Sequence, residues 1–197
     1  IMSNITKPHD RQPGLIQTIL DGIVWVSQLA AWLVILIIAI VLLSVLVSIL
    51  DIGKIVEWES DVILFGERLT GASLGDLQWH IFGLMLMLTM AGALITDSHV
   101  RVDFFRQSMS RRKKRLVDIF GHLFFLIPFC YVAVVHGWAF TARALRLDEG
   151  SDYDGLYDRF LIKGTIPLGF ALLLIAAVLL VIQNIQQLRT PDDKERN

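Results

Sequence analysis

The sequence lacks a second cysteine and lacks an excess of charge of either sign. Cys130 alone excludes an intramolecular disulfide and a cysteine-based metal centre. With 18 lysines and arginines against 19 aspartates and glutamates, the chain also lacks the basic surface of a nucleic-acid-binding module. We therefore expect no nucleic-acid partner.

Motifs of enzyme chemistry are missing as well. The chain has no glycine-rich phosphate loop, no His-Glu-x-x-His zinc motif, no Gly-x-Ser-x-Gly nucleophile motif and no acidic cluster inside an apolar run. We expect neither catalysis nor a metal or other cofactor. Transport by this chain alone is not indicated either, because secondary transporters usually show inverted repeats and broken helices near the midplane.

The sequence is rich in apolar residues, which make up 54% of it, and its mean hydropathy is +0.59. A helix that crosses a bilayer needs about 20 mostly apolar residues. Four runs meet this requirement, at about 29–50, 77–96, 116–142 and 165–185. The sequence therefore predicts an all-α integral membrane protein with one membrane domain of four transmembrane helices.

Basic residues are concentrated between the second and third runs. Because cytoplasmic loops carry the excess of lysine and arginine, we expect this loop inside, and with four spans both termini are cytoplasmic. A basic run in this loop is predicted to set the topology and to lie where it attracts acidic phospholipid headgroups. It consists of Arg111, Arg112, Lys113, Lys114 and Arg115.

Two further segments have the apolar spacing of helices that do not span the membrane. In residues 54–69, Ile55, Trp58, Val62, Phe65 and Leu69 recur at steps of three and four. This spacing predicts an amphipathic helix lying flat in an outer loop. Residues 14–27 repeat in the same way and predict an interfacial helix ahead of the first span.

Histidine spacing keeps a redox alternative open. His122 and His136 are fourteen residues apart, so on one helix they are about 40° out of phase and about 21 Å apart, which suits two haem ligands. His80 and His99, on the neighbouring run, are about 100° out of phase and do not suit the opposite positions. The alternative is thus a haem-b-binding membrane anchor of a redox complex. A stand-alone structural membrane protein is a third alternative.

Two groups of residues are candidates for contacts with partners. Asp118 and His122, one turn apart at the start of the third span, are placed to pair with each other, with a partner helix or with interfacial water. The loop 143–163 combines acids with tyrosines, a composition that suits a docking surface as well as a plain solvated loop. Its candidates are Glu149, Ser151, Tyr153, Tyr157 and Lys163.

Several of these runs resemble the small membrane subunit of tripartite ATP-independent periplasmic (TRAP) transporters, over about 33–187. The first two are Leu77–Phe82 (LQWHIF) and His99–Asp103 (HVRVD). The others are Glu149–Ser151 (EGS), Gly155–Lys163 (GLYDRFLIK) and Ile166–Phe170 (IPLGF), which are similar to the mannitol or chloroaromatic branch. The stretch from Asp51 to Gly75 is longer than is usual in that family.

The resemblance implies a scaffold subunit in the bacterial inner membrane. Its implied partners are a large elevator-type membrane subunit, which takes up an organic acid anion (a carboxylate or sulfonate) with sodium, and a periplasmic substrate-binding protein. Trp79, His99, Arg101 and Asp103 match family motif positions and would serve assembly at the two membrane interfaces. Glu149, Ser151 and Lys163 match the outer-loop motif and would contact the large subunit or the binding protein.

Overall fold

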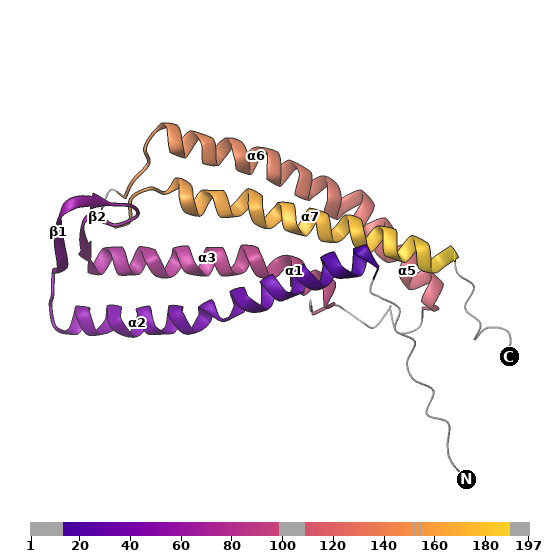
Figure 1. Ribbon diagram of the computed structural model, residues 1–197, viewed down its shortest axis with the longest axis horizontal. Helices are drawn as coiled ribbons and strands as arrows, with labels where there is room; N and C mark the ends of the chain where they lie inside the picture. Colours follow the sequence, from indigo (N-terminus) through magenta and orange to yellow (C-terminus); the bar gives the residue numbers. More distant parts are fainter. Residues whose placement is uncertain (1–13, 99–108, 152, 154, 190–197) are drawn as a thin grey trace, which may run out of the picture.

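The computed structural model describes residues 14–98, 109–151, 153 and 155–189. These residues form long helices and one β-hairpin (Figure 1). In chain order the elements are α1 (Leu15–Ala31), α2 (Leu33–Ile49), β1 (Lys54–Val62), β2 (Gly66–Thr70), α3 (Gly71–Ile95), α5 (Arg111–Gly121), the π-helical turn η1 (His122–Leu126), α6 (Ile127–Arg146) and α7 (Phe160–Arg189).

The expectation of four membrane-spanning helices is confirmed in the described part of the chain. Four continuous helical stretches are long and apolar enough to cross a bilayer. They are 15–49, which joins α1 and α2, then 71–95, 111–146, which joins α5, η1 and α6, and 160–189. All four begin ahead of the predicted runs, the first because α1 precedes its apolar run and the others by five or six residues.

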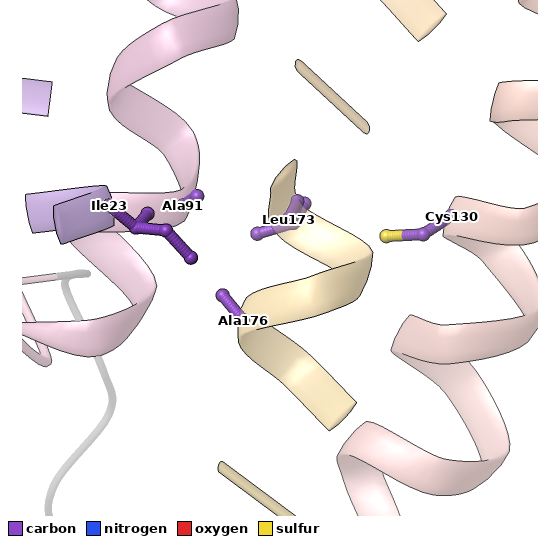
Figure 2. Packing of buried hydrophobic residues seen from close by; sticks show 5 residues of the cluster. All are labelled: Ile23, Ala91, Cys130, Leu173 and Ala176. Carbon is purple, nitrogen blue, oxygen red and sulfur yellow. The ribbon is translucent and has the colours of Figure 1, made fainter. Parts of the chain in front are cut away.

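The helices lie in a row rather than in a closed bundle (Figure 1). Helix α6 packs along α7, α7 packs along α3, and α3 packs along both α1 and α2. The apolar centre of this row joins α1, α3, α6 and α7 through Ile23, Ala91, Cys130, Leu173 and Ala176 (Figure 2). Figure 2 shows the Cys130 side chain of α6 pointing toward α7. Because the row has two broad faces, most apolar side chains on α2 and α6 remain exposed.

Small residues allow these helices to approach closely. A Cβ atom on Gly92 of α3 would lie 2.4 Å from the Ser27 side chain of α1, and one on Gly169 of α7 would lie 2.7 Å from the backbone oxygen of Met87. Between α6 and α7, Gly137 faces Pro167. Ser27 adds a hydrogen bond from its Oγ to the carbonyl oxygen of Leu88 on α3 (2.9 Å). Close backbone approach of this kind is typical of helix pairs in membranes, where packing and hydrogen bonds hold helices together.

The predicted amphipathic helix at 54–69 is wrong, because the segment forms the antiparallel hairpin of β1 and β2. Glu57, Glu59 and Asp61 recur at every second position, with Val56, Trp58, Ser60 and Val62 between them, which is the period of a strand. Gly66 has a φ of +63°, which ends any helix and suits a turn. Trp58 and Phe65 contact each other edge to face, with ring centroids 6.4 Å apart. Trp58 and Phe65 are thus seven residues apart because they meet across the hairpin, and not because they lie on one face of a helix.

Helix α1 does form where the interfacial helix was predicted, but its apolar face packs inside the molecule. Leu20, Ile23 and Ala30 are buried, and α1 contacts α3 and α7. Around Trp32 the hydrogen bonds tighten from a spacing of four residues to three, and the helix bends into α2 (Figure 1). Residues 15–49 would measure about 52 Å, which exceeds the roughly 30 Å of a bilayer core.

Two prolines lie inside membrane-spanning helices. A proline in mid-span predicts a kink at Pro128, and the structure places the π-helical turn η1 just before it. Because proline cannot donate to the carbonyl four residues earlier, the wider turn accommodates the missing bond. Proline also suits the first turn of a helix, which predicts Pro167 at the start of the fourth span. This prediction is wrong, because α7 already begins at Phe160 and Pro167 lies inside it.

We expect Gly169→Ala to lower the stability of the protein by about 1–3 kcal/mol, because the new methyl group would force α3 and α7 apart. The measurement is thermal unfolding in detergent. Unfolding is monitored by the reaction of a thiol-reactive dye with Cys130, which is fully buried in the folded chain. The matched control is Gly121→Ala, which meets nothing within 4 Å and gains helix propensity. Equal melting temperatures for the two variants would contradict the tight α3–α7 contact.

Candidate assembly and docking surfaces

The hairpin and the connection between α6 and α7 lie together at one end of the row (Figure 1). We call β1, β2 and the described part of residues 147–159 the hairpin end. Glu67 and the acids of β1 are exposed there and Arg68 is half-buried, whereas Leu156 of the connection is fully buried. The hairpin end is therefore a folded cap with an apolar anchor and a charged surface.

Asp76, in the second turn of α3, holds the connection against that helix. Its Oδ2 accepts a hydrogen bond from the backbone N–H of Leu156 (3.1 Å), and the Arg159 guanidinium lies 4.0 Å away. A Cβ atom on Gly155 would lie 2.1 Å from the same carboxylate oxygen, so the connection can pass this close only with glycine. Asp76 thus joins α3 to the segment that leads into α7.

The turn of the hairpin is fixed to the same connection. The N–H of Tyr157 donates to the carbonyl oxygen of Leu64 (2.9 Å), and the N–H of Leu64 donates to the carboxylate of Asp158 (3.1 Å). Leu64 has a φ of +75°, a conformation that costs a non-glycine residue about 1–2 kcal/mol. The Tyr157 ring fills the space above Gly66 and Gly150. These contacts hold the strained turn in one conformation.

Lys163, near the start of α7, forms an ion pair with Glu149 at the start of the connection that precedes this helix. The Lys163 side chain is only 17% exposed, and its ammonium lies 4.1 Å from the centroid of the Phe140 ring on α6. A mostly buried cation beside an aromatic face and a carboxylate is stabilised by both. These two predicted docking residues therefore join α6 to α7 inside the molecule.

An acidic cleft of about 430 Å³ opens between the hairpin and the connection. The side chains that line it carry four carboxylates and one guanidinium. They are Asp61, Val62, Ile63, Glu67, Arg68, Asp148, Tyr157 and Asp158. In the described residues no group of three or more histidine, cysteine or acidic side chains is arranged to hold a metal ion. The four carboxylates of the lining therefore concentrate negative charge in this cleft.

Lys54 and Glu57 pair at the base of the hairpin, outside the acidic cleft. The hydrogen bond and the charge of Lys54 lower the pKa of Glu57. Both side chains are more than half exposed, so the pair adds little to stability. It does neutralise one acid of the hairpin, which leaves the cleft as the main concentration of negative charge among the residues described there.

The remaining docking candidates are divided between the inside and the surface. Tyr157 is 37% exposed and contributes one edge of its ring to the acidic cleft. Ser151 is half-buried beside Gly155. Tyr153 is 84% exposed and, with Ser48, Asp51 and Thr70, lines a second hollow of about 500 Å³ above the end of α2. Of the five, Tyr153 has its side chain most available to another protein.

Trp79 lies on the outer surface of α3, 71% exposed. It contacts Phe82 edge to face and, with Ile37 of α2 and Gln78, lines a shallow groove of about 290 Å³ that we call the Trp79 groove. A large exposed ring next to a groove is typical of a residue at the centre of a protein interface. The structure thus leaves this predicted assembly residue accessible from outside the row.

At the other end of the molecule, Asp118 and His122 lie one turn apart at the junction of α5 and η1, and both are half-buried. The basic run forms the first turn and a half of α5. Arg115 donates to the carbonyl oxygen of Gln187 near the end of α7 (3.1 Å), so part of this run positions helices. His99, Arg101 and Asp103 lie outside the described residues.

The histidines do not face a common interior. His80 lies on α3 with Nδ1 2.7 Å from the carbonyl oxygen of Asp76, whereas His136 is exposed on α6. Helix α7 lies between α3 and α6 (Figure 1). A haem held by two histidines needs them on facing helices. The arrangement of the helices in the row therefore gives no support to a haem held by His80 and His136.

Sequence reasoning missed Asp76 as a functional residue, and it gave Tyr157 no structural role. Asp76 stands at the start of a predicted span, where a carboxylate is expected in the interface. Its partner Leu156 is 80 residues later in the chain. The available signal was Gly155 within the run Gly155–Lys163, since a glycine can mark close approach of the backbone to another group.

Comparison with known proteins places the sequence in a family. Residues 64–187 match the family described as tripartite ATP-independent periplasmic transporters, DctQ component. This match covers more than half of the chain and begins in the turn of the hairpin, so α1, α2 and β1 precede it. No curated protein and no solved structure matches the chain significantly.

Asp76→Ala is expected to loosen the hairpin end while leaving the helices folded, because it removes the acceptor for Leu156 and the charge beside Arg159. We expect trypsin to cleave after Arg159 about tenfold faster in this variant, since cleavage follows the population of the open segment. The control is Asp61→Ala, which removes an exposed carboxylate from the same end. Equal cleavage rates in the two variants would show that Asp76 does not hold the connection.

Proposed function

The chain belongs to the DctQ family, the small membrane components of TRAP transporters, and from this premise we propose that it braces the large membrane subunit and helps to dock the periplasmic substrate-binding protein. It is a multi-pass membrane protein and a transporter component rather than an enzyme. Large subunits and binding proteins are the partners of this family in general.

The observation that carries the proposal is the family match, which covers α3, α6 and α7. Helices α3 and α7 form the centre of the row, and α6 forms one of its edges. A row of helices with two exposed apolar faces buries little of its own surface. Such a shape supplies area for lipid and for another membrane protein. The large subunit is the occupant that the family provides.

We assign assembly to the Trp79 groove, because Trp79 matches a family motif position and lies exposed on a central helix. His99, Arg101 and Asp103 match motif positions as well, and by the same reasoning they serve assembly at the opposite membrane interface. Asp118 and His122 are proposed contacts at that interface too, since both lie half-buried at the junction between α5 and η1.

Docking of the binding protein is assigned to the hairpin end. The acidic cleft and the exposed Tyr153 lie on its surface, while Glu149, Ser151 and Lys163 hold that surface in place. Under this proposal the hairpin end faces the periplasm and both chain termini lie in the cytoplasm. The concentration of basic residues in 101–115 supports that orientation.

The transported substrate and the driving ion follow from the family resemblance. We propose sodium-coupled uptake of an organic acid anion, a carboxylate or sulfonate, as in the mannitol or chloroaromatic branch that the sequence motifs resemble. Selectivity for that anion would belong to the binding protein and the large subunit. The membrane is the bacterial inner membrane, whose lipids surround the exposed faces of the row.

The first test purifies the tagged chain from its own membranes in mild detergent. We expect one large polytopic protein to co-elute in stoichiometric amount, without a haem spectrum, and deletion of the chain to abolish sodium-driven uptake. A haem spectrum, or elution of the chain alone, would contradict the proposal.

Trp79→Ala is expected to lower the recovery of the large subunit about tenfold in the same purification, because truncation of a central interface tryptophan costs 2 kcal/mol or more. The matched control is Trp138→Ala, since Trp138 is 67% exposed on α6. Equal losses in the two variants would place assembly elsewhere.

Charge removal in the acidic cleft tests docking separately. The triple variant D61N/E67Q/D148N keeps side-chain size, and asparagine tolerates the positive φ of Asp148. We expect the concentration of loaded binding protein needed for half-maximal uptake in proteoliposomes to rise about tenfold and to depend less on salt. The control E57Q/E59Q removes two acids of β1 outside the cleft. Unchanged docking in the triple variant would contradict this role.

A further inference from the structure

The basic run of α5 continues into an apolar groove along the same helix. The groove measures about 480 Å³ and is lined by Leu116, Val117, Ile119, Phe120, Leu123 and Phe124. Its side chains are largely exposed, with Phe120 at 55% and Phe124 at 61%. From Leu116 to Phe124 it extends over about 12 Å of helix, close to the depth of one membrane leaflet.

The five basic residues divide between two sides of α5. At 100° per residue, Arg112 and Lys113 stand one turn above Leu116 and Val117, at the mouth of the groove. Arg111, Lys114 and Arg115 turn toward the opposite side, where Lys114 and Arg115 are half-buried and Arg115 donates to Gln187 of α7. Arg112 and Lys113 are exposed.

The acid of this helix lies on the second side. Asp118 follows Lys114 by four residues and Arg115 by three, so it shares their side of the helix. The two exposed cations of the groove side, Arg112 and Lys113, stand above apolar side chains. A positive pair above an apolar groove of one leaflet's depth is complementary to a negatively charged headgroup above an acyl chain.

We propose that this side of α5 and η1 binds one anionic phospholipid, with its phosphodiester headgroup at Arg112 and Lys113 and an acyl chain along Leu116, Phe120 and Phe124. The site uses only the membrane-spanning character of the helix and stands independently of the transporter function. It assigns lipid binding to two of the five basic residues and helix positioning to Arg115.

The test titrates phosphatidylglycerol into the delipidated full-length chain and counts bound lipid by native mass spectrometry. The double variant R112Q/K113Q is expected to weaken binding on the order of 30-fold, the product of two basic residues near a headgroup. The matched control R111Q/K114Q removes two charges from the other side of the same turn and should change binding less than threefold. Phosphatidylcholine should bind much more weakly than phosphatidylglycerol to the unaltered chain.

A third variant, Leu123→Trp, fills the groove and keeps every charge. It is expected to displace the lipid while the thermal unfolding temperature stays near that of the unaltered chain, because the site of the new ring is exposed. Equal losses in the two double variants would overturn the proposal in favour of general surface attraction. Retention of phosphatidylglycerol in the filled groove, or equal binding of phosphatidylcholine, would also overturn it.

Discussion

Close approach of helix backbones is the constraint on which the rest of this structure depends. Apolar side chains gain little from leaving lipid for one another, so neighbouring helices must gain through packing at short range. Gly92 against Ser27, Gly169 against Met87, and Gly137 against Pro167 provide that range at three successive contacts of the row. Each contact joins one pair of helices, which produces a row and leaves two broad faces for lipid and partner.

At the hairpin end, two of these helix pairs, α3 with α7 and α7 with α6, are joined by a second set of contacts. Asp76 links α3 to the segment entering α7, and Lys163 with Glu149 and Phe140 links α7 to α6. Ionic and hydrogen-bonded contacts add to close glycine packing here, because the end of the row holds charged groups that the apolar spans lack. The spacing of these helices is therefore fixed both within the apolar part of the row and at its charged end.

The sequence predicts the parts of this architecture that depend on composition. Span number follows from apolar runs, because lipid requires about 20 such residues in each helix. The segment 54–69 fails, since spacings of three and four also arise when Trp58 and Phe65 meet across a turn. From the sequence alone, Gly83, Gly92 and Gly137 suit packing inside the molecule as well as packing on a partner. The short distances from a Cβ atom at these positions to Ile162, Ser27 and Pro167 assign them to the inside. The contact of Asp76 with Leu156 joins residues 80 positions apart, which local patterns do not encode.

The basic run shows how one sequence feature serves several physical purposes at once. The number of its basic residues predicts that this loop stays in the cytoplasm, and that prediction does not depend on the side of the helix on which each charge lies. On helix α5 the five basic side chains divide between two sides. Arg115 turns to α7 and satisfies a carbonyl oxygen near the helix end, while Arg112 and Lys113 turn outward above an apolar groove. The direction of charge, rather than its amount, is therefore what distinguishes a helix contact from a membrane contact in this segment.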